Sequence, residues 1–346
     1  MAWRRHLSGV AVCLASSLVL SSCGGGGSDD AVVKAANTSA TERSPATGSA
    51  VILPGVWPLT GKALEGDGPR HPVYVVKIDN TSSSAPQVGL GSADMVVEEL
   101  VEGGLTRLAV FYDSSIPSAV GPVRSMRASD VGIVKPASAL LVASGAARRT
   151  TRVLRNHHVA TVTEGTRPGF YRDAGRAAPY NLFMRLPELG RHLGPHWSTP
   201  LHPYMGFGGH AFDSVSSSRV RSMAVTFSSG HTTDWRHTSA GWVRPGSYAT
   251  SGDDFVADNV LLLRVRIGDA GYLDPAGNPV PETVFSGTGP AVLVHGDAAV
   301  RCTWSKRDKA GELRLTTKRG RPLGVPPGRT WIELVPADTG GLALHR

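Results

Sequence analysis

The spacing of hydrophobic residues predicts an α/β arrangement in the first part of the chain. Short runs rich in β-branched and aromatic residues, bounded by turn residues, are typical of strands. Such runs occupy residues 72–79, 105–112, 138–146 and 159–164. Residues 150–157 and 186–194 have the wider hydrophobic spacing of short helices. Alternating strands and helices favour an α/β domain with a mixed sheet, which we assign to residues 51–204.

A different pattern begins at Met205. Short runs separated by turn residues predict a smaller, mostly antiparallel β domain over residues 205–340. The clearest of these runs are residues 220–229, 259–267, 291–306 and 330–336. The expected fold class is therefore α/β of mixed α+β character, with a β-rich C-terminal domain.

The first 22 residues have the pattern of a lipoprotein signal peptide. Arg4 and Arg5 precede an apolar stretch at 9–20 that is too short to span a bilayer. The stretch ends in the letters LSSC, which resemble a bacterial lipobox with Cys23 as the acylated residue. The alternative is an ordinary secretory signal that is cut nearby. Two acyl chains on Cys23 would give a stable membrane anchor on the outer face of the cell membrane.

Residues 23–50 are rich in Gly, Ser, Thr and Ala and contain almost no large apolar side chains. Such a segment cannot bury enough surface to order itself, so we expect a disordered, flexible tether. A tether of this length reaches on the order of 25–30 Å.

The net charge and the cysteine content limit the kinds of ligand and metal site that we expect. Loss of Arg4 and Arg5 with the signal lowers the net charge from +8 to about +6, which favours loose association with an anionic membrane or wall polymer. Basic residues scatter along the chain, a pattern that does not indicate nucleic-acid binding. After Cys13 is removed and Cys23 acylated, Cys302 alone remains, so neither a disulfide nor a cysteine metal site is expected. No metal and no cofactor are predicted.

Residues 98–107, EELVEGGLTR, contain the densest group of charges in an apolar region. Gly103 and Gly104 between two strand-like runs predict a β-hairpin. A helix over the first run, with the glycines at its C-terminus, is the alternative. We prefer the hairpin because a strand begins again at Leu105.

A two-residue tip at the glycines would place Leu100 opposite Arg107. Glu98 and Glu102 would then lie on the same face as Arg107 and form a structural ion network with it. Glu99 would point to the other face without a cation. It is therefore the better candidate for chemistry.

Other polar residues could join Glu99 at a ligand site. Arg124 and Arg127 follow a Gly-Pro pair, and a helix beginning near Val123 would place both on one face, where guanidinium groups bind carboxylate or phosphate. Their alternative role is to neutralise nearby acids. Asp79 and Asn80 end a strand, where an Asx turn or a binding loop is common. Asn181 belongs to a polar-aromatic set suited to a carbohydrate surface.

The order of these segments resembles the YerB-like lipoproteins, the family of the domain of unknown function DUF3048. The N-terminal resemblance rests on PLTGK, VVKIDN, APQVGLGSADMVVEELVEGGLTRLAVFY, GPVRSMR, FYRD and PYNLF. The C-terminal resemblance rests on VADNVLLL, TWSK and GRTWIELVP. The resemblance as a whole implies an extracytoplasmic lipoprotein of two α/β-type domains. It does not imply any particular enzymatic reaction. The family tends to have His where Tyr180 stands and a His-x-Asp element that SYATSGDDFVADN lacks.

Two functions follow from these observations. In the first, the protein is a non-catalytic envelope lipoprotein that binds a wall polymer or an envelope protein through Asp79, Asn80, Glu99, Arg124, Arg127 and Asn181. In the second, it is a glycan or peptidoglycan hydrolase or transferase with Glu99 as general acid or base and Asp79 as its partner. We prefer the first because no nucleophile signature or metal set accompanies the acids.

Overall fold

The computed structural model describes residues 55–66, 68–194, 202–208 and 212–346, and Ala50–Arg346 form one compact unit. The predicted signal peptide, Cys23 and the tether lie outside the described residues. Among the helices that the structure does describe, none is both long and apolar enough to cross a membrane.

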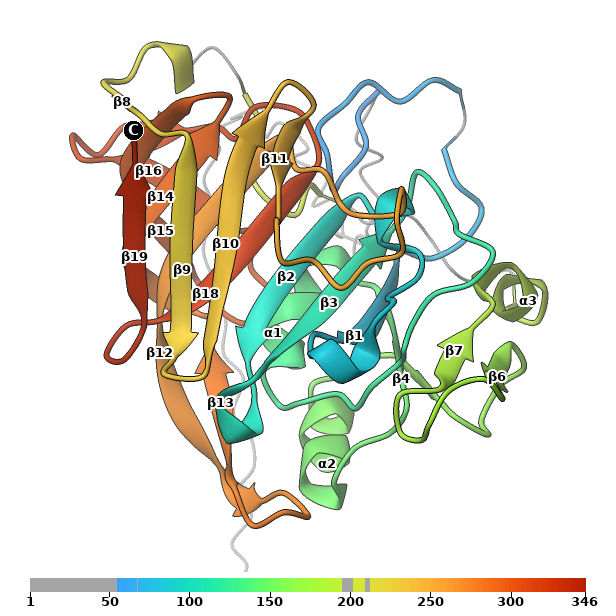
Figure 1. Cartoon of the computed structure of the whole chain (residues 1–346). Coiled ribbons are helices and arrows are strands. Elements are labelled where there is room, and N and C mark those ends of the chain that lie inside the picture. The colour runs from blue at the N-terminus through green and yellow to red at the C-terminus, as the bar shows by residue number, and fades with distance from the viewer. Residues whose placement is uncertain (1–54, 67, 195–201, 209–211) are drawn as a thin grey trace, which may run out of the picture. The chain divides into compact units, whose positions relative to one another are not determined.

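A mixed sheet of 13 strands runs through the unit (Figure 1). Its strands from the N-terminal part are β1 (Tyr74–Asp79), β2 (Met95–Leu100), β3 (Thr106–Tyr112), β4 (Leu140–Ala143) and β5 (Thr161–Thr163). Its strands from the C-terminal part are β8 (Ser218–Arg219), β12 (Asn259–Leu273), β13 (Pro279–Val284), β14 (Gly287–His295), β15 (Ala298–Lys306), β16 (Arg314–Thr317), β17 (Pro322–Leu323) and β18 (Thr330–Pro336). The central order is β14-β12-β18-β2-β3-β1-β4.

Smaller elements surround this sheet. A four-stranded sheet contains β9 (Ser222–Ser228), β10 (His231–Thr238), β11 (Gly241–Val243) and β19 (Gly341–His345). A two-stranded sheet contains β6 (Phe170–Arg172) and β7 (Leu182–Met184). The described part of the chain includes the helices α1 (Asp130–Val134), α2 (Arg148–Asn156) and α3 (Leu186–Arg191), and short 3-10 turns at Ser82–Ser84, Leu90–Ser92, Glu102–Gly104 and Lys135–Ala137.

The strands β2 and β18 join the two halves of the chain. They pair in parallel from Met95 opposite Thr330 to Glu99 opposite Leu334. The sheet therefore crosses the boundary that we placed after residue 204. The assignment of 51–204 and 205–340 as separate domains stays a prediction.

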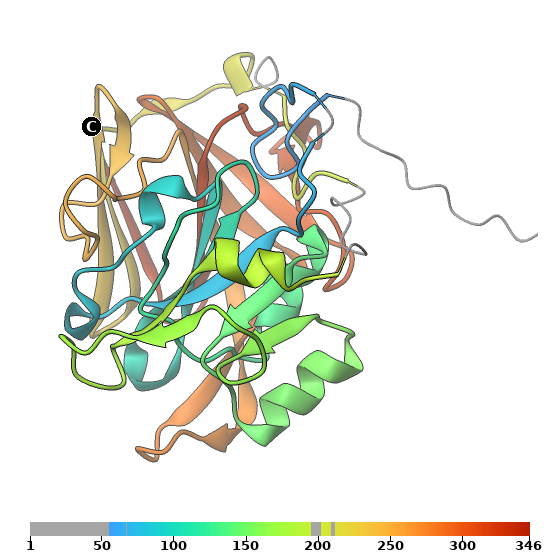
Figure 2. The ribbon, with the colours of Figure 1, turned by 90° about the vertical axis from the view of Figure 1, so that its right-hand side faces the viewer.

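Each face of the main sheet has its own hydrophobic core, because successive side chains on a strand point to opposite faces. One face packs against α1 and α2 through side chains such as Val131 and Leu154. The other packs against the four-stranded sheet through Phe227 and Trp235. Figure 2 shows the two kinds of cover on opposite sides of the main sheet.

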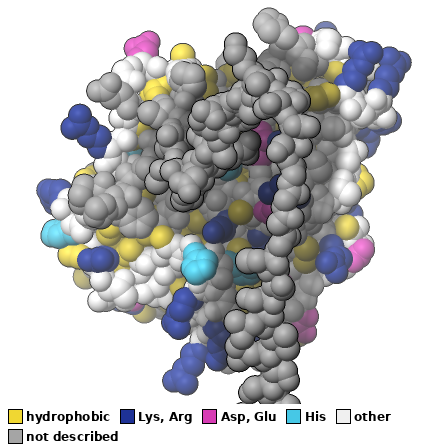
Figure 3. Space-filling model, turned by 180° about the vertical axis from the view of Figure 1, so that it is seen from behind, with side chains coloured by type: hydrophobic (Ala, Val, Ile, Leu, Met, Phe, Trp, Pro, Cys, Tyr) yellow, Lys and Arg dark blue, Asp and Glu magenta, His cyan; other side chains and the backbone are white. Residues whose placement is uncertain are grey.

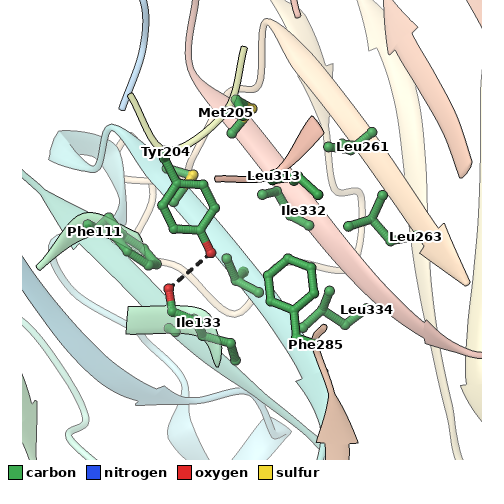
Figure 4. Packing of buried hydrophobic residues seen from close by; sticks show 14 of the residues in the cluster. Phe111, Ile133, Tyr204, Met205, Leu261, Leu263, Phe285, Leu313, Ile332 and Leu334 are labelled. Carbon is green, nitrogen blue, oxygen red and sulfur yellow. Dashed lines mark hydrogen bonds between the residues drawn. The ribbon is translucent and has the colours of Figure 1, made fainter. Parts of the chain in front are cut away.

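Figure 4 shows part of the core on the helical face, which includes Phe111, Ile332 and Leu334. Tyr204, which is fully buried, donates a hydrogen bond of 3.0 Å to the backbone oxygen of Ile133 (Figure 4). This bond satisfies the hydroxyl in an otherwise apolar environment.

The predicted fold class is confirmed: a mixed sheet with few helices is formed by the N-terminal part, and the C-terminal part is β-rich. The hairpin at residues 95–112 is also confirmed, and the helical alternative for its first strand is wrong. The expected helix near Val123 is wrong too. Val123 forms a bridge to Ile78 in extended structure, and α1 begins at Asp130.

Candidate functional site

The turn of the β2–β3 hairpin contains three residues, Glu102, Gly103 and Gly104. Both glycines have positive φ angles, 69° and 72°, a conformation that other residues rarely adopt. Val101 donates its backbone hydrogen bond to Leu105 across this turn. The extra turn residue shifts the register by one, so Glu99 rather than Leu100 lies opposite Arg107. The predicted register is therefore wrong, and every side chain of β2 exchanges faces relative to β3.

Glu99 has a cation, contrary to our expectation. The Nζ of Lys77 lies 2.7 Å from Oε1 of Glu99 and 2.8 Å from Oδ1 of Asp130, and all three side chains are fully buried. Lys77 reaches Glu99 from β1, two strands away, across the small side chain of Ala109, which lies opposite both Lys77 and Val97. Pairing of this kind is what allows charges to remain inside a protein.

Arg107 and Arg127 share Glu102. Arg107 Nη2 lies 3.6 Å from Glu102 Oε1, and Arg127 binds both carboxylate oxygens, with its Nε 2.8 Å from Oε2. Although burial raises the pKa of Glu102, the hydrogen bond from Arg127 and the two guanidinium charges outweigh it and lower the pKa to about 2. The predicted ion network thus contains Glu102 and Arg107. Glu98 does not belong to it, because the register places Glu98 on the opposite face.

Asp79 and Arg124 form a second ion pair on the same face. Arg124 Nε lies 3.0 Å from Asp79 Oδ2, and its guanidinium stacks over the ring of Tyr180. Asp79 and Glu99 lie on either side of Arg107, which is opposite both of them in the sheet. The structure therefore brings Asp79, Glu99 and Arg124 to one region, each with an oppositely charged partner.

Asn80 and Asn181 lie elsewhere. Asn80 faces the four-stranded sheet, where its amide donates to Glu98 Oε1 at 3.0 Å and to Thr106 at 2.9 Å. Asn181 precedes β7, and its side-chain oxygen accepts a hydrogen bond from Arg172. The six residues predicted to bind a ligand are thus distributed over three places.

Glu98 is the centre of a buried polar cluster that the sequence did not predict. Its Oε1 accepts from Asn80, from Thr106 at 2.7 Å, from Thr233 at 3.0 Å, and lies 3.0 Å from His231 Nε2. Burial by itself raises the pKa of Glu98. The contact with His231 and the hydroxyl donor Thr106 outweigh it and bring the pKa below its ordinary value.

A second acid, Glu333, lies beside Glu98 in the register of β18 and β2. Trp235 donates to Glu333 Oε1 at 2.7 Å. Burial, followed by the negative charge of Glu98, raises the pKa of Glu333 well above its ordinary value. Oε2 of each acid lacks a donor among the other described residues. The raised pKa favours the protonated form of Glu333, which removes the repulsion between the two adjacent carboxylates.

Two cavities open on the face of β15 that is turned toward the four-stranded sheet. The first, of about 740 Å³, is lined by Arg301 and by three basic residues of the β16–β17 turn, Lys318, Arg319 and Arg321. The second, of about 780 Å³, is lined mostly by apolar atoms and shares Arg301 and Lys318 with the first. None of the six predicted ligand-binding residues lines either cavity.

The sequence pattern of charges did not lead us to predict these cavities. The segment TKRGR at residues 317–321 could have indicated a basic site, because three of the four residues at 318–321 are basic. Pairing of Cys302 with Thr317 then brings Arg301 beside them. Basic side chains also gather at the upper right of Figure 3, on the side of the molecule that carries β14, β15 and β16.

Within the described residues, no group of three or more His, Cys, Asp or Glu side chains is arranged to hold a metal ion. The only described cysteine, Cys302, is buried, and burial raises the pKa of its thiol to about 12. The thiol is therefore protonated at neutral pH.

Comparison with known families gives two consecutive matches. Residues 59–196 match "Protein of unknown function (DUF3048) N-terminal domain", and residues 223–332 match the C-terminal domain of the same name. The first match contains both hairpin strands and the second contains β10, β12 and the first residues of β18.

One relative and one solved structure agree with these matches. The chain is 25% identical over 289 residues to "Putative lipoprotein YerB" of Bacillus subtilis (strain 168), covering 81% of this chain and 86% of the relative. It is similar to the crystal structure of the YerB protein from Bacillus subtilis, with a TM-score of 0.67 and 20% identity. That similarity covers 83% of this chain and 99% of the other, and it concerns the fold.

Proposed function

This chain belongs to the DUF3048 family, and from that premise we propose that it is a lipoprotein anchored to the outer face of the cell membrane. The name of the Bacillus subtilis relative supports this proposal. Cys23 at the end of the apolar stretch 9–20 would carry the acyl chains. Residues 23–50 would hold the folded unit away from the bilayer.

Labelling with a fatty-acid probe tests the anchor. Cells that express the protein are grown with an alkyne-tagged fatty acid, and the membrane and soluble fractions are then compared. We expect label on the wild type and on Cys302→Ser, the matched control, and none on Cys23→Ser. An unlabelled wild type found in the cytosol would overturn the proposal.

We further propose that the folded unit binds an envelope ligand without turning it over. The observation that carries this proposal is the first cavity, where none of its four basic side chains forms a salt bridge with a carboxylate among the described residues. Guanidinium groups that lack an internal partner are available to an anionic ligand. Glu99 and Asp79, by contrast, are neutralised within the protein by Lys77 and Arg124.

The hydrolase alternative required Glu99 and Asp79 to share a site without a cation within about 4 Å. Glu99 has Lys77 at 2.7 Å and Asp79 has Arg124 at 3.0 Å. The geometry therefore does not favour this alternative.

Binding and turnover can be measured together. The mature chain carrying Cys23→Ser is incubated with purified envelope fractions, and the bound protein and the released soluble fragments are both measured. We expect retention without fragment release, and Glu99→Gln to behave like the parent. Fragment release that Glu99→Gln abolishes would establish the enzyme instead.

A further inference from the structure

The two cavities on β15 form one continuous surface because they share Arg301 and Lys318. We propose that this surface is a binding site for an anionic amphiphile, a molecule with a phosphate head group and a hydrocarbon chain. The proposal deepens the binding function above and rests on it, since it names the chemical class of the ligand.

The first cavity supplies the contacts for the head group. Arg301, Lys318, Arg319 and Arg321 are all exposed, and neither Asp nor Glu is among the described residues that line this cavity. Ser216, Ser217 and Ser218 line the same cavity, and serine side chains can donate hydrogen bonds. Converging guanidinium groups favour phosphate because they bind two of its oxygens at once.

The second cavity supplies the contacts for a hydrocarbon chain. Among the residues that line it, the exposed Pro290 and the half-buried Leu342 present apolar surface to solvent, whereas Leu262, Val292 and Val335 are buried beside them. Leu342 of β19 lines it from the second sheet. The cavity therefore lies where the space between the two sheets opens toward the surface. Its size falls in the range of small-molecule sites, about 300–1,000 Å³.

The adjoining apolar cavity favours an amphiphile over a hydrophilic polyanion. A wall polymer with repeated phosphates would be bound by the basic residues, but it would leave the apolar side chains of Pro290 and Leu342 in contact with water. A hydrocarbon chain covers these two side chains and is stabilised by the burial of apolar surface. A lipid-anchored protein would also work close to a source of such molecules.

A chain-length series tests the proposal without any mutation. Binding of dodecyl phosphate, hexyl phosphate and inorganic phosphate to the mature Cys23→Ser chain is measured by calorimetry at monomeric concentrations. We expect affinity to rise at least about tenfold from inorganic phosphate to dodecyl phosphate, which corresponds to about 1.4 kcal/mol. Dodecyl maltoside, which lacks the charge, should bind more weakly than dodecyl phosphate. Equal affinity across the series would overturn the amphiphile proposal.

Two variants assign the binding to these cavities. The double variant Arg301→Gln, Arg319→Gln should weaken the binding of dodecyl phosphate by about tenfold. The control is the double variant Arg152→Gln, Arg155→Gln on α2, which removes the same charge and should leave this binding unchanged. Leu342→Gln, which removes apolar surface without adding charge, should weaken the binding of dodecyl phosphate but not that of inorganic phosphate. Unchanged binding in the Arg301 and Arg319 variant would place the ligand elsewhere and reject the site.

Failure of the amphiphile proposal can be distinguished from failure of the proposed envelope-binding function. If a polyanion such as polyphosphate binds tightly and dodecyl phosphate does not, the protein is a binding protein but its ligand is a polymer. If neither ligand binds and envelope fractions do not retain the protein, the binding function itself fails. Lipidation of Cys23 is measured independently of both.

Discussion

The Nε2 atom of His231 lies 3.0 Å from Oε1 of Glu98. His231 belongs to β10 in the four-stranded sheet, and Glu98 belongs to β2 in the main sheet. The contact therefore joins the two sheets across their interface, and it also connects the two regions that match the DUF3048 domains. Glu98 is fully buried, so this contact stabilises a carboxylate that water does not reach.

Replacement of His231 should destabilise the fold. His231→Ala removes one of the groups that surround Glu98 Oε1, and we expect the free energy of unfolding to fall by about 1–3 kcal/mol. Urea denaturation at neutral pH measures the change. His157→Ala, at the exposed end of α2, is the control and should have little effect. Equal stability of the two variants would show that the His231 contact contributes nothing.

Replacement of Lys77 should have a larger effect. Lys77→Met leaves Glu99 and Asp130 buried without their cation, and we expect a loss of about 3–5 kcal/mol in the free energy of unfolding. The control is Lys62→Met. The side chain of Lys62 is 52% exposed and pairs with Asp258, so its loss should lower the free energy of unfolding by less than about 1 kcal/mol. Adding Glu99→Gln to Lys77→Met should recover part of the loss. If it recovers none, the ion pair is not the cause.

Asp113 should make stability decrease as pH rises. Burial, followed by the charge of Asp94, raises the pKa of Asp113 to about 7, while its value in the unfolded chain is about 3.9. Between these values the folded protein binds more protons, so the free energy of unfolding falls by up to about 1.4 kcal/mol per pH unit. Asp113→Asn should flatten this dependence and be more stable than the wild type at pH 8.

Unfolding measured from pH 4 to pH 8 tests this prediction. Asp234→Asn, which changes an exposed acid on β10, should keep the slope of the wild type. A slope that persists unchanged in Asp113→Asn would mean that another group titrates.

Lys306 should make the free energy of unfolding increase with pH above neutrality, opposite to the effect of Asp113. Its Nζ donates to the backbone oxygen of Gly132 at 2.6 Å, and burial lowers the pKa of Lys306 to about 7 against about 10.4 in the unfolded chain. Between these values the unfolded chain binds more protons, so stability rises with pH. Lys306→Met should remove this rise between pH 7 and pH 10, measured by urea denaturation. Lys135→Met, a residue that is not fully buried, is the control and should retain it.

Local sequence was sufficient for much of the fold. The apolar runs of β1, β3, β12 and β18 were predicted because a strand buried on both faces requires a continuous hydrophobic segment. The glycines at 103–104 likewise predicted the hairpin because few other residues adopt positive φ. The length of the turn was not encoded as clearly, and a difference of one residue moved Glu98 and Glu99 to different faces than expected.

The sequence by itself determined where the strands lie, where the hairpin turns and which side chains carry charge. The tertiary structure decided which charges meet: Glu99 with Lys77, Glu98 with His231, which is 133 residues away, and Arg301 with the basic β16–β17 turn. Strand formation depends on residues that are neighbours in the chain, whereas charge pairing depends on the order and register of strands from distant segments. Whether an acid is neutralised or a cation is left available for a ligand follows from that order, because burial makes an unpaired charge costly.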